Sequence, residues 1–258
     1  MEEKMKLPIS VVLLTHNEEN NISACLESCS FAGEIIVVDD DSSDRTVEIA
    51  KSFDGVRLFH RALNGDFGAQ KSFGVTQATN EWIFLIDADE RVTAQLAEFI
   101  QKVVCNGEKF CYWVQRENHF KNMIARHGTM RPDWVPRLMP KEGVKVSGCI
   151  HEMVISPLPK RKALGRLIHF SYTSWDQFYE KQNLYSRLAA KKLQEQNRPC
   201  NFLSHVFFHP IWAFIKDYFF NLGFLDGRYG FIFAANHYCY TLSKYVRYYQ
   251  IRNFDGKL

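Results

Sequence analysis

The chain has 258 residues, enough for one large α/β domain or for one domain with an appendage. Hydrophobic residues make up 46% of the chain and charged residues 24%, close to the averages of soluble globular proteins, which excludes a disordered or fibrous protein. The 32 Lys and Arg residues exceed the 29 Asp and Glu residues by a net charge of only +3, too little to indicate wholesale binding to a nucleic-acid backbone.

The cysteines and the first residues indicate a compartment. Seven cysteines, an odd number without regular spacing, are typical of free thiols in a reducing environment, so we expect the cytosol. Cys25 and Cys29 have no second pair at zinc-ligand spacing, and we interpret them as buried thiols rather than metal ligands. Residues 1–7 carry charges of both signs and run directly into a strand, which predicts no signal peptide.

The N-terminal part of the chain alternates strand and helix signals at short intervals. Continuous apolar runs predict buried strands at residues 9–14, 34–38, 56–60 and 82–86. Helical spacing and capping signals predict helices at residues 18–29, 46–53, 69–78 and 93–104. Asp44 stands where its carboxylate can cap the helix that begins at Thr46. This alternation is typical of parallel βαβ units, so we expect an α/β fold with a mostly parallel central sheet.

Beyond residue 104 the pattern becomes less regular. Strand-like segments are predicted at residues 110–115, 134–139 and 145–147. From Ser174 onward, apolar residues at three-to-four spacing predict a helix that carries several Lys and Arg residues. We therefore expect a first domain over residues 1–172, subdivided at residue 104, and a helical extension over residues 173–258.

The C-terminal extension is rich in aromatic residues. Residues 199–215 form a stretch of 17 residues without Asp, Glu, Lys or Arg. This stretch includes His205, His209 and Pro210 and falls short of the roughly 20 apolar residues of a membrane-spanning helix. We expect an interfacial segment rather than a spanning one. The alternative is that these aromatic residues form the core of a helical subdomain, and both interpretations can hold together.

Polar and acidic residues follow three of the predicted strands at the point where each strand ends. The segments are residues 15–19 (Thr-His-Asn-Glu-Glu), 39–44 (Asp-Asp-Asp-Ser-Ser-Asp) and 87–90 (Asp-Ala-Asp-Glu). In an open parallel sheet the carboxyl ends of the strands share one edge, where ligands bind. Asp87 and Asp89 alternate at the last of these strand ends and can offer oxygen ligands to Mg²⁺ or Mn²⁺, which in turn holds a diphosphate.

Two other nucleotide-binding motifs are absent from the sequence. No G-x-G-x-x-G follows a predicted strand, which argues against a dinucleotide-binding domain. Residues 65–72 look at first like a P-loop, but the glycine before Lys71 stands three positions back rather than adjacent. We therefore reject an NTPase.

Four segments occur in the order and spacing of a known family. They are Thr15-x-Asn-x-Glu19, Ile36-Val-Val-Asp-Asp-x-Ser-x-Asp44, the Gly-rich residues 64–74 and Leu85-Ile-Asp-Ala-Asp-Glu90. As a set they resemble family 2 glycosyltransferases with a GT-A fold, which implies a UDP-sugar donor and Mg²⁺ or Mn²⁺. The resemblance assigns Thr15, Asn17, Glu19 and Asp39 to the uridine, Lys71 to the donor, and Asp87 and Asp89 to the ribose and the metal. Asp41 belongs to the same donor-binding segment, but the family usually has Gly at this position.

The remaining chain looks like the subgroup that glucosylates the inner core of lipopolysaccharide, of the WaaE or LgtF type. The supporting stretches are Trp134-Val-Pro-Arg-Leu138, Ile150-His-Glu152, Lys181-Gln-Asn-x-Tyr-Ser-Arg187 and Gly223-Phe-Leu-Asp-Gly-Arg-Tyr-Gly230. This resemblance implies transfer of glucose from UDP-glucose to a heptose of a lipid-linked saccharide acceptor. It further implies that residues 1–104 bind the nucleotide sugar, residues 105–172 bind the acceptor, and residues 173–258 lie near the membrane.

The basic and aromatic C-terminal part suits an acceptor that is phosphorylated and embedded in a membrane. Lys and Arg meet head-group phosphates, while Phe, Tyr and Trp settle at the interface. We therefore expect an anionic membrane surface as a partner, no nucleic acid, and a peripheral position on the cytoplasmic face of the inner membrane.

Members of this family type invert the anomeric centre, which requires a general base opposite the departing diphosphate. Glu152 is the first candidate because it lies downstream of the D-x-D motif, where the acceptor side should assemble, and Asp133 is the second. The alternative is that Glu152 is a surface acid and His151 an ordinary loop histidine. Arg137 can pair either with a donor phosphate or with a structural carboxylate, and the sequence leaves both open.

Two rival functions remain at this point. One is an inverting transferase that acts on a polyprenyl-phosphate or another polysaccharide acceptor, which a pair of long spanning helices would favour. The other is a non-catalytic nucleotide-sugar or RNA-binding module that uses the basic helix after Ser174. The acidic strand ends speak against RNA.

Overall fold

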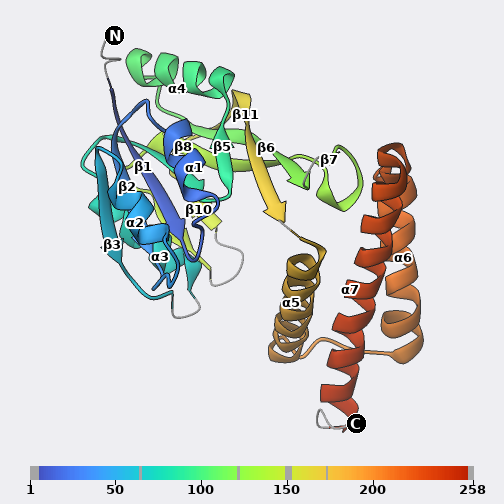
Figure 1. Cartoon of the computed structure of the whole chain (residues 1–258). Coiled ribbons are helices and arrows are strands. Elements are labelled where there is room, and N and C mark those ends of the chain that lie inside the picture. Colours follow the sequence, from blue (N-terminus) through green and yellow to red (C-terminus); the bar gives the residue numbers. More distant parts are fainter. Residues whose placement is uncertain (1–5, 64–65, 121–122, 149–152, 173, 255–258) are drawn as a thin grey trace. The chain divides into compact units, whose positions relative to one another are not determined.

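The computed structural model describes residues 6–63, 66–120, 123–148, 153–172 and 174–254 (Figure 1). The chain divides into two compact units that are interleaved in sequence. Unit 1 comprises Met1–Arg116 and Asp133–His169, and unit 2 comprises Glu117–Pro132 and Phe170–Leu258. The expected domains, residues 1–172 and 173–258, stay a prediction.

Unit 1 is built on a sheet whose first strands are parallel. In spatial order these strands are β3 (Val56–His60), β2 (Ala32–Asp39), β1 (Leu7–Thr15) and β4 (Trp82–Asp87). The sheet continues through β8 (Asp133–Pro140), β6 (Cys111–Phe120), β11 (Lys160–Tyr172) and β5 (Glu90–Val92). Antiparallel pairing joins β4 to β8, β8 to β6, and β11 to β5. Two small pairings add β7 (Met123–Ile124) to β6 and join β9 (Lys145–Ser147) to β10 (Met153–Ile155).

The parallel strands form because their apolar residues can be buried on both faces of the sheet. Val11 and Leu13 face the core that contains α1 (Ile22–Ser28), α2 (Thr46–Lys51) and α4 (Ala94–Asn106). Val12 lies between them in sequence and faces the opposite core, with α3 (Phe67–Gln77). Helices on both faces and parallel strands at the centre confirm the predicted α/β fold.

One glycine of the Gly-rich segment allows α3 to lie close to the sheet. A Cβ atom at Gly74 would lie 2.5 Å from Cγ1 of Val12 and 3.2 Å from Cγ2 of Val38. Any larger residue would push the helix away from β1 and β2. The glycine at this position therefore has a packing role.

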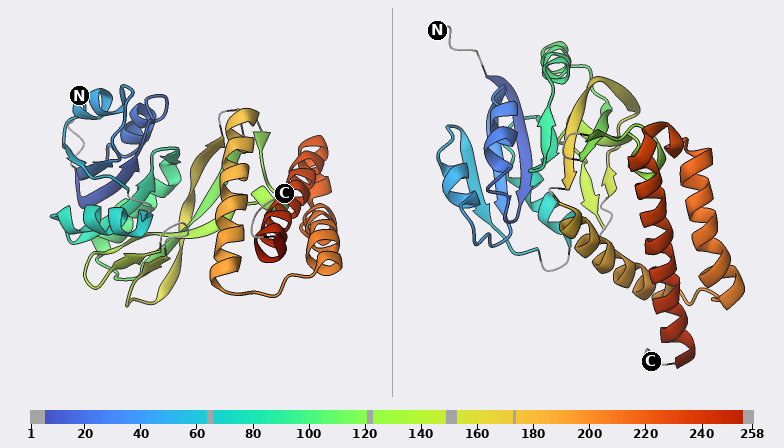
Figure 2. Two further views of the ribbon diagram at one scale, coloured as in Figure 1. Left: turned by 90° about the horizontal axis from the view of Figure 1, so that it is seen from below. Right: turned by 45° about the vertical axis from the view of Figure 1, so that its right-hand side comes forward.

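Unit 2 is helical, as the sequence predicts for the C-terminal region. Its main elements are α5 (Trp175–Glu195), a π-helical stretch Phe202–Phe208, α6 (His209–Ile215), a second π-helical stretch Lys216–Phe220, and α7 (Gly227–Phe254). Helices α6 and α7 lie side by side in both views of Figure 2. Within the described part of the chain, no helix has both the length and the apolar character needed to cross a membrane.

An aromatic cluster forms the core of unit 2. Phe120, Phe178 and Phe233 are buried against one another, and Tyr172 and Trp175 pack around them. The ring of Phe120 lies 4.6 Å from that of Trp175 and 5.7 Å from that of Phe233. Some of the C-terminal aromatic residues thus form a helical core, as one of the two interpretations of the sequence expects.

Polar contacts join residues 123–132 to the helices of unit 2. Asp217, which is 3% exposed, accepts hydrogen bonds from Thr129 and from Asn221 Nδ2, the latter at 2.8 Å, and pairs with His237 Nδ1 at 2.5 Å. Asp226 accepts from the backbone N–H of His127 at 2.8 Å. Both acids therefore serve structure in unit 2, because each satisfies donors from a different chain segment.

Two glycines of the segment 223–230 make the start of α7 compact. A Cβ atom at Gly230 would lie 1.7 Å from the backbone oxygen of Gly223, a distance that no side chain can occupy. The two residues approach each other so closely that only glycine fits at position 230. The segment 223–230 is one of those on which the subgroup resemblance depends, and this close contact explains why it has glycine at position 230.

Candidate active site

The strand register brings the predicted acidic segments to one edge of the sheet. Thr15, the last residue of β1, is paired with Asp39, the last residue of β2. On the other side of β1, Leu14 is paired with Asp87, the last residue of β4. Because β2, β1 and β4 are adjacent and parallel, their carboxyl ends open at the same edge. Thr15, Asp39 and Asp87, which the resemblance assigns to the donor, thus lie at the carboxyl ends of three neighbouring strands.

Asp39 is fully buried at this edge and is held by polar contacts. Its carboxylate accepts from the backbone N–H of Ser42 at 3.0 Å and from the Ser42 hydroxyl at 2.5 Å. Nδ1 of His60 lies 3.4 Å from Oδ2 of the same carboxylate. Beside it, the Thr15 hydroxyl is buried and has no hydrogen-bond partner among the described residues. At this part of the sheet edge, the Asp39 carboxylate is thus a hydrogen-bond acceptor held in place, and the Thr15 hydroxyl has no partner among the described residues.

Hydrogen bonds join the loop after β1 to the loop after β2. The backbone N–H of Asn17 donates to the Ser42 hydroxyl at 2.9 Å, and its side-chain oxygen accepts from the N–H of Ser43 at 2.8 Å. The N–H of Glu19 donates to Oδ2 of Asp44 at 3.1 Å. The structure thus uses Asn17 and Glu19 to shape the loops that surround Asp39.

Asp41 adopts a backbone conformation that explains the glycine usual in the family. Its φ is +49°, in the left-handed region, and its side chain is exposed. Asp and Asn enter this region more readily than most residues because their short polar side chains can hydrogen-bond locally. The loop therefore keeps a conformation that suits glycine although position 41 is an aspartate.

Asp87 is bound to two cationic side chains. Nζ of Lys71 lies 2.9 Å from its Oδ1, and Nη2 of Arg137 lies 2.7 Å from its Oδ2. Burial alone would raise the pKa of this carboxyl, but the charges of Arg137 and Lys71 outweigh it and hold the pKa of Asp87 well below its ordinary value. Arg137, left open by the sequence, pairs with carboxylates of its own chain.

Glu90 extends this ionic cluster into the core. It is fully buried, and its Oε1 lies 2.6 Å from Nη2 of Arg137 and 3.7 Å from Nη1 of Arg116. Burial raises the pKa of Glu90 above its ordinary value, and the charge of Asp87 adds to this effect. Arg116 also binds Asp133 through Nε at 3.1 Å and Nη2 at 2.8 Å. The sequence did not reveal the ionic role of Glu90, because its partners Arg116 and Arg137 are distant in the sequence.

Asp89 lies beside a histidine that comes from a distant strand. Oδ2 of Asp89 is 3.2 Å from Nε2 of His169, which belongs to β11. His169 belongs to none of the motifs found in the sequence, because it is 80 residues away from Asp89. In the part of the chain that the structure describes, Oδ1 of Asp89 makes no hydrogen bond or ion pair, whereas both oxygens of Asp87 do. Asp89 and His169 therefore suit a divalent cation better than Asp87 does.

The described residues contain no group of three or more His, Cys, Asp and Glu side chains arranged for a metal ion. The first candidate for the general base, Glu152, lies outside the described residues. The second candidate, Asp133, receives two hydrogen bonds from Arg116, one on each carboxylate oxygen. As placed, Asp133 is a partner of Arg116.

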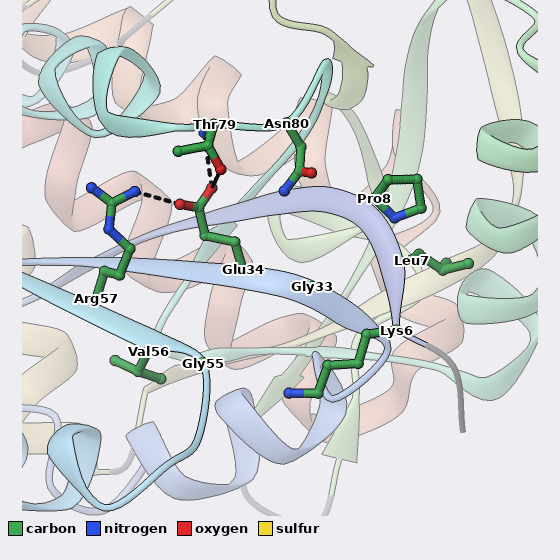
Figure 3. A pocket seen from close by; sticks show the side chains of 10 residues that line it. All are labelled: Lys6, Leu7, Pro8, Gly33, Glu34, Gly55, Val56, Arg57, Thr79 and Asn80. Carbon is green, nitrogen blue, oxygen red and sulfur yellow. Dashed lines mark hydrogen bonds and ion pairs between the residues drawn. The ribbon is translucent and has the colours of Figure 1, made fainter. Parts of the chain in front are cut away.

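A pocket of about 500 Å³ lies at the opposite edge of the sheet, where the parallel strands begin (Figure 3). Leu7, Gly33 and Val56 line it at the starts of β1, β2 and β3. Inside it, Glu34 is bound to Arg57 and accepts from the N–H of Thr79 at 2.9 Å. This pocket is separate from the acidic edge and shares no residue with it.

Comparison with known proteins gives the chain a family. The model of the family "Glycosyl transferase family 2" matches residues 10–157, more than half of the chain. The lipopolysaccharide core biosynthesis glycosyltransferase LpsC of Rhizobium meliloti (strain 1021) is 29% identical over 253 residues, which cover 95% of this chain and 93% of that protein. An uncharacterized glycosyltransferase of Rickettsia bellii (strain RML369-C) is 28% identical over 273 residues, covering 99% of this chain and 90% of the relative.

Among solved structures, S. aureus TarS 1–349 in complex with UDP is similar at a TM-score of 0.47 and 15% identity. The similarity covers 98% of this chain and 92% of the TarS chain. The match to the family model, together with the α/β architecture, confirms the predicted family and the predicted GT-A fold class. The chain belongs to glycosyl transferase family 2.

Proposed function

We propose that the chain is an inverting glycosyltransferase that moves a hexose, with glucose as the first candidate, from a UDP-sugar to a heptose of the lipopolysaccharide inner core. The observation that carries the proposal is the shared sheet edge, where Asp39 ends β2 and Asp87 ends β4, one on each side of β1. Just beyond β4, Asp89 lies beside His169 of β11. Membership of glycosyl transferase family 2 supports a sugar-nucleotide donor. The name of the R. meliloti relative supports an acceptor in the lipopolysaccharide core.

In this proposal the uridine lies against the loops that follow β1 and β2. A carboxylate offers about four acceptor positions, so Asp39 retains capacity for a donor of the uracil ring beside its bonds to Ser42. The hydroxyl of Thr15, which has no partner in the described part of the chain, provides a further contact at the same part of the sheet edge. Asn17 and Glu19 act mainly by fixing the two loops, as their hydrogen bonds indicate.

Asp87 is a carboxylate held in place by two cationic side chains, and in this proposal it lies beside the uridine. Because Lys71 and Arg137 keep it ionised at neutral pH, Asp87 can accept hydrogen bonds from ribose hydroxyls. Lys71 is 2% exposed and acts through Asp87, which it orients. The donor contact expected of Lys71 is therefore indirect in this proposal.

Asp89 and His169 are the residues that would hold a divalent cation, Mg²⁺ or Mn²⁺. The fit rests on Oδ1 of Asp89, which has no partner among the described residues, and on the imidazole 3.2 Å from its Oδ2. A bound cation supplies positive charge against the diphosphate that departs. Arg137 and Lys71 are less suited to this task, because both are buried against Asp87 and Arg137 also pairs with Glu90.

Direct displacement with inversion needs one base that takes the proton of the acceptor hydroxyl. We propose Glu152 for this role. The occupation of both Asp133 oxygens by Arg116 supports this ranking, since a carboxylate held by a guanidinium is a weaker proton acceptor. Residues 105–172 would then contribute the acceptor side and residues 1–104 the donor side.

The acceptor in this proposal is a lipid-linked saccharide, and the enzyme works as a peripheral protein on the cytoplasmic face of the inner membrane. The support comes from unit 2, where large apolar side chains such as Trp212 and Phe220 are more than half exposed. Exposed aromatic side chains of this kind favour a membrane interface.

The test is a transfer assay with a panel of UDP-sugars and lipopolysaccharide acceptors truncated within the inner core. We expect one UDP-hexose to react only with acceptors that expose the heptose, and the product to show inverted anomeric configuration by NMR. Asp89→Ala should fold normally and lose this turnover. Transfer to a polyprenyl phosphate instead, or UDP binding without any transfer, would contradict the proposal and favour one of the rival functions.

A further inference from the structure

Unit 2 carries many exposed apolar side chains on the helical segment before α7. We call this set, within residues 202–225, the apolar strip. Eight of its members are between 53% and 68% exposed, among them Leu203, Phe207, Phe208, Trp212, Phe220 and Leu225. The rings of Trp212 and Phe220 lie 5.5 Å apart, and those of Phe207 and Phe208 lie 5.2 Å apart. Groups of exposed apolar side chains on this scale mark an interaction surface.

The apolar strip is almost free of charge. Residues 199–215 contain no Asp, Glu, Lys or Arg, and in the remainder of the strip Asp217 is buried, so Lys216 is the exposed charged residue. A surface that is apolar along its length and basic where it is charged complements a bilayer of anionic lipid.

Three basic side chains, two from the same segment and one from α7, pack around the ring of Tyr245. Nζ of Lys244 lies 4.4 Å from the ring centre of Tyr245, on which His209 also packs at 5.0 Å. The ring of His205 lies 4.7 Å from that of His209. We call Lys244, His205 and His209 the cationic cluster. Among the residues that the structure describes, no carboxylate forms an ion pair with any of the three.

The surroundings of the cationic cluster disfavour its positive charge in the absence of an anion. Burial lowers the pKa of Lys244. Burial lowers the pKa of His209 as well, and the nearby charges of His205 and Lys244 lower it further. An anion placed among these groups would reverse both effects. The cluster therefore has the character of an anion site that is assembled before the anion arrives.

We propose that unit 2 docks on an anionic phospholipid bilayer, with the apolar strip in the interface and the cationic cluster bound to a lipid head-group phosphate. The proposal rests on the proposed function in that it supplies the membrane contact of an enzyme with a lipid-linked acceptor. It goes further in that it assigns a surface and a phosphate site to named residues. Strip and cluster belong to one helical segment, in which His205 and His209 pack on Tyr245 of α7 while Phe207 and Phe208 are exposed.

The first test measures co-sedimentation of the full chain with phosphatidylcholine vesicles that contain or lack phosphatidylglycerol. We expect binding to the anionic vesicles and little binding to the neutral ones. Lys244→Met should weaken the binding about fivefold, the effect of one basic residue near a charged surface. Lys192→Met changes the net charge equally at an exposed site on α5 and should leave binding nearly unchanged.

The second test removes apolar contact. Trp212→Ala and Phe207→Ser together should weaken vesicle binding at least about tenfold, because the two rings no longer enter the interface. Leu164→Ser is the control, since Leu164 is 66% exposed but belongs to unit 1. Thermal unfolding of each variant shows whether a loss of binding reflects a loss of folding.

Three outcomes would overturn the proposal. The first is that the wild-type protein and the Lys244, Trp212 and Phe207 variants bind the vesicles equally. Self-association in sedimentation velocity that the Trp212 variant abolishes, without vesicle binding, would assign the strip to a second copy of the chain. Displacement by inorganic phosphate at constant ionic strength, with no effect of lipid charge, would assign the cluster to a soluble phosphate.

The same variants separate this proposal from the proposed function. Calorimetric UDP binding and transfer to a water-soluble acceptor fragment should be unchanged in the Lys244 and Trp212 variants. If vesicle binding follows the expectation but no transfer occurs in any protein, the proposed function fails alone. If transfer occurs and vesicle binding does not, the docking proposal fails alone.

Discussion

Lys71 and Asp87 form an ion pair in which the lysine is almost fully buried. The Nζ to Oδ1 distance is 2.9 Å, and 2% of Lys71 is exposed. The pair ties α3 to the end of β4 and leaves Asp87 with a cation on each oxygen. Both carboxylate oxygens of the first acid of the D-x-D motif are thereby paired within the chain, which is why we propose the second acid, Asp89, together with His169 as the metal ligands.

Replacement of Lys71 by methionine keeps the aliphatic stem and removes the charge. We expect Lys71→Met to lower the free energy of unfolding by about 2–3 kcal/mol, since a buried pair loses one partner while Asp87 keeps Arg137. Urea denaturation measures the effect, with Lys51→Met as a control at an exposed site of α2. A change below about 0.5 kcal/mol would mean that the pair adds nothing to stability.

Removal of the His169 imidazole should weaken the cation site without unfolding unit 1. We expect His169→Ala to raise the Mn²⁺ concentration for half-maximal activity by about 10- to 100-fold. Calorimetric Mn²⁺ binding in the presence of UDP gives a second readout that does not depend on turnover. The control is His119→Ala, which alters a histidine of unit 2. Unchanged Mn²⁺ affinity in the His169 variant would remove this residue from the site.

Position 41 tests the backbone conformation of the donor loop. Asp41→Gly should leave UDP affinity unchanged and keep or slightly raise the free energy of unfolding, because glycine adopts a positive φ without a steric cost. Asp41→Val should lower stability by about 1–2 kcal/mol, the cost of a left-handed conformation for a branched residue. Chemical denaturation and UDP titration of both variants provide the comparison. Equal stability of the two would show that the loop is not held at this φ.

The two candidates for the general base should respond differently to neutralisation. Glu152→Gln should leave UDP binding intact and lower kcat by about 10²- to 10⁴-fold. Asp133→Asn should lower kcat much less and lower stability by about 1 kcal/mol, because it breaks a partly exposed pair with Arg116. Steady-state kinetics with the identified acceptor measure both. The reverse order would transfer the role to Asp133, and a loss of UDP binding in the Glu152 variant would place this residue in the donor pocket.

Glu34 gives the stability a defined dependence on pH. Burial raises the pKa of this carboxyl, but hydrogen bonds from Ser10, Thr79 and Arg57 outweigh it and lower the pKa below its ordinary value. Figure 3 shows the contacts of Glu34 with Thr79 and Arg57. The stabilisation is present above the unfolded pKa of about 4.3 and is lost as the pH falls through the folded value. Glu34→Gln should therefore cost about 1–3 kcal/mol at neutral pH and much less in acid. A pH-independent difference between variant and wild type would contradict this.

The parallel half of the sheet could be predicted because its information is local. The strand expected at residues 56–60 is β3 without change, and the expected strand at residues 82–86 is β4 less one residue. Both runs are apolar and bounded by polar residues, so hydrophobic periodicity alone marks them. The antiparallel half of the sheet was harder to predict from the sequence. Strand β11 begins with exposed basic residues and contains Gly165 at a φ of +88°, so it lacks an apolar run.

The candidate site divides in the same way. Asp39, Asp87 and Asp89 follow strongly apolar strands, and the topology of parallel sheets predicts their common edge. His169 and Glu90 could not be assigned from the sequence, because their roles arise from tertiary contacts. His169 meets Asp89 across 80 residues, and Arg137 meets Glu90 across 47. No local pattern carries information about pairs at such separations.

The interleaving of the two units determines the order in which a nascent chain can fold. Residues 117–132 leave the ribosome long before the residues that they contact, since the backbone N–H of Arg126 bonds to Asp226, 100 residues later. Likewise, the ring of Phe120 cannot be fully buried until Phe233 of α7 has been synthesised and packs against it. Contacts this distant in sequence form slowly, and the apolar surface that waits for them is prone to aggregation. A chain that ended before α7 would therefore lose the folding of an internal segment together with its last helix.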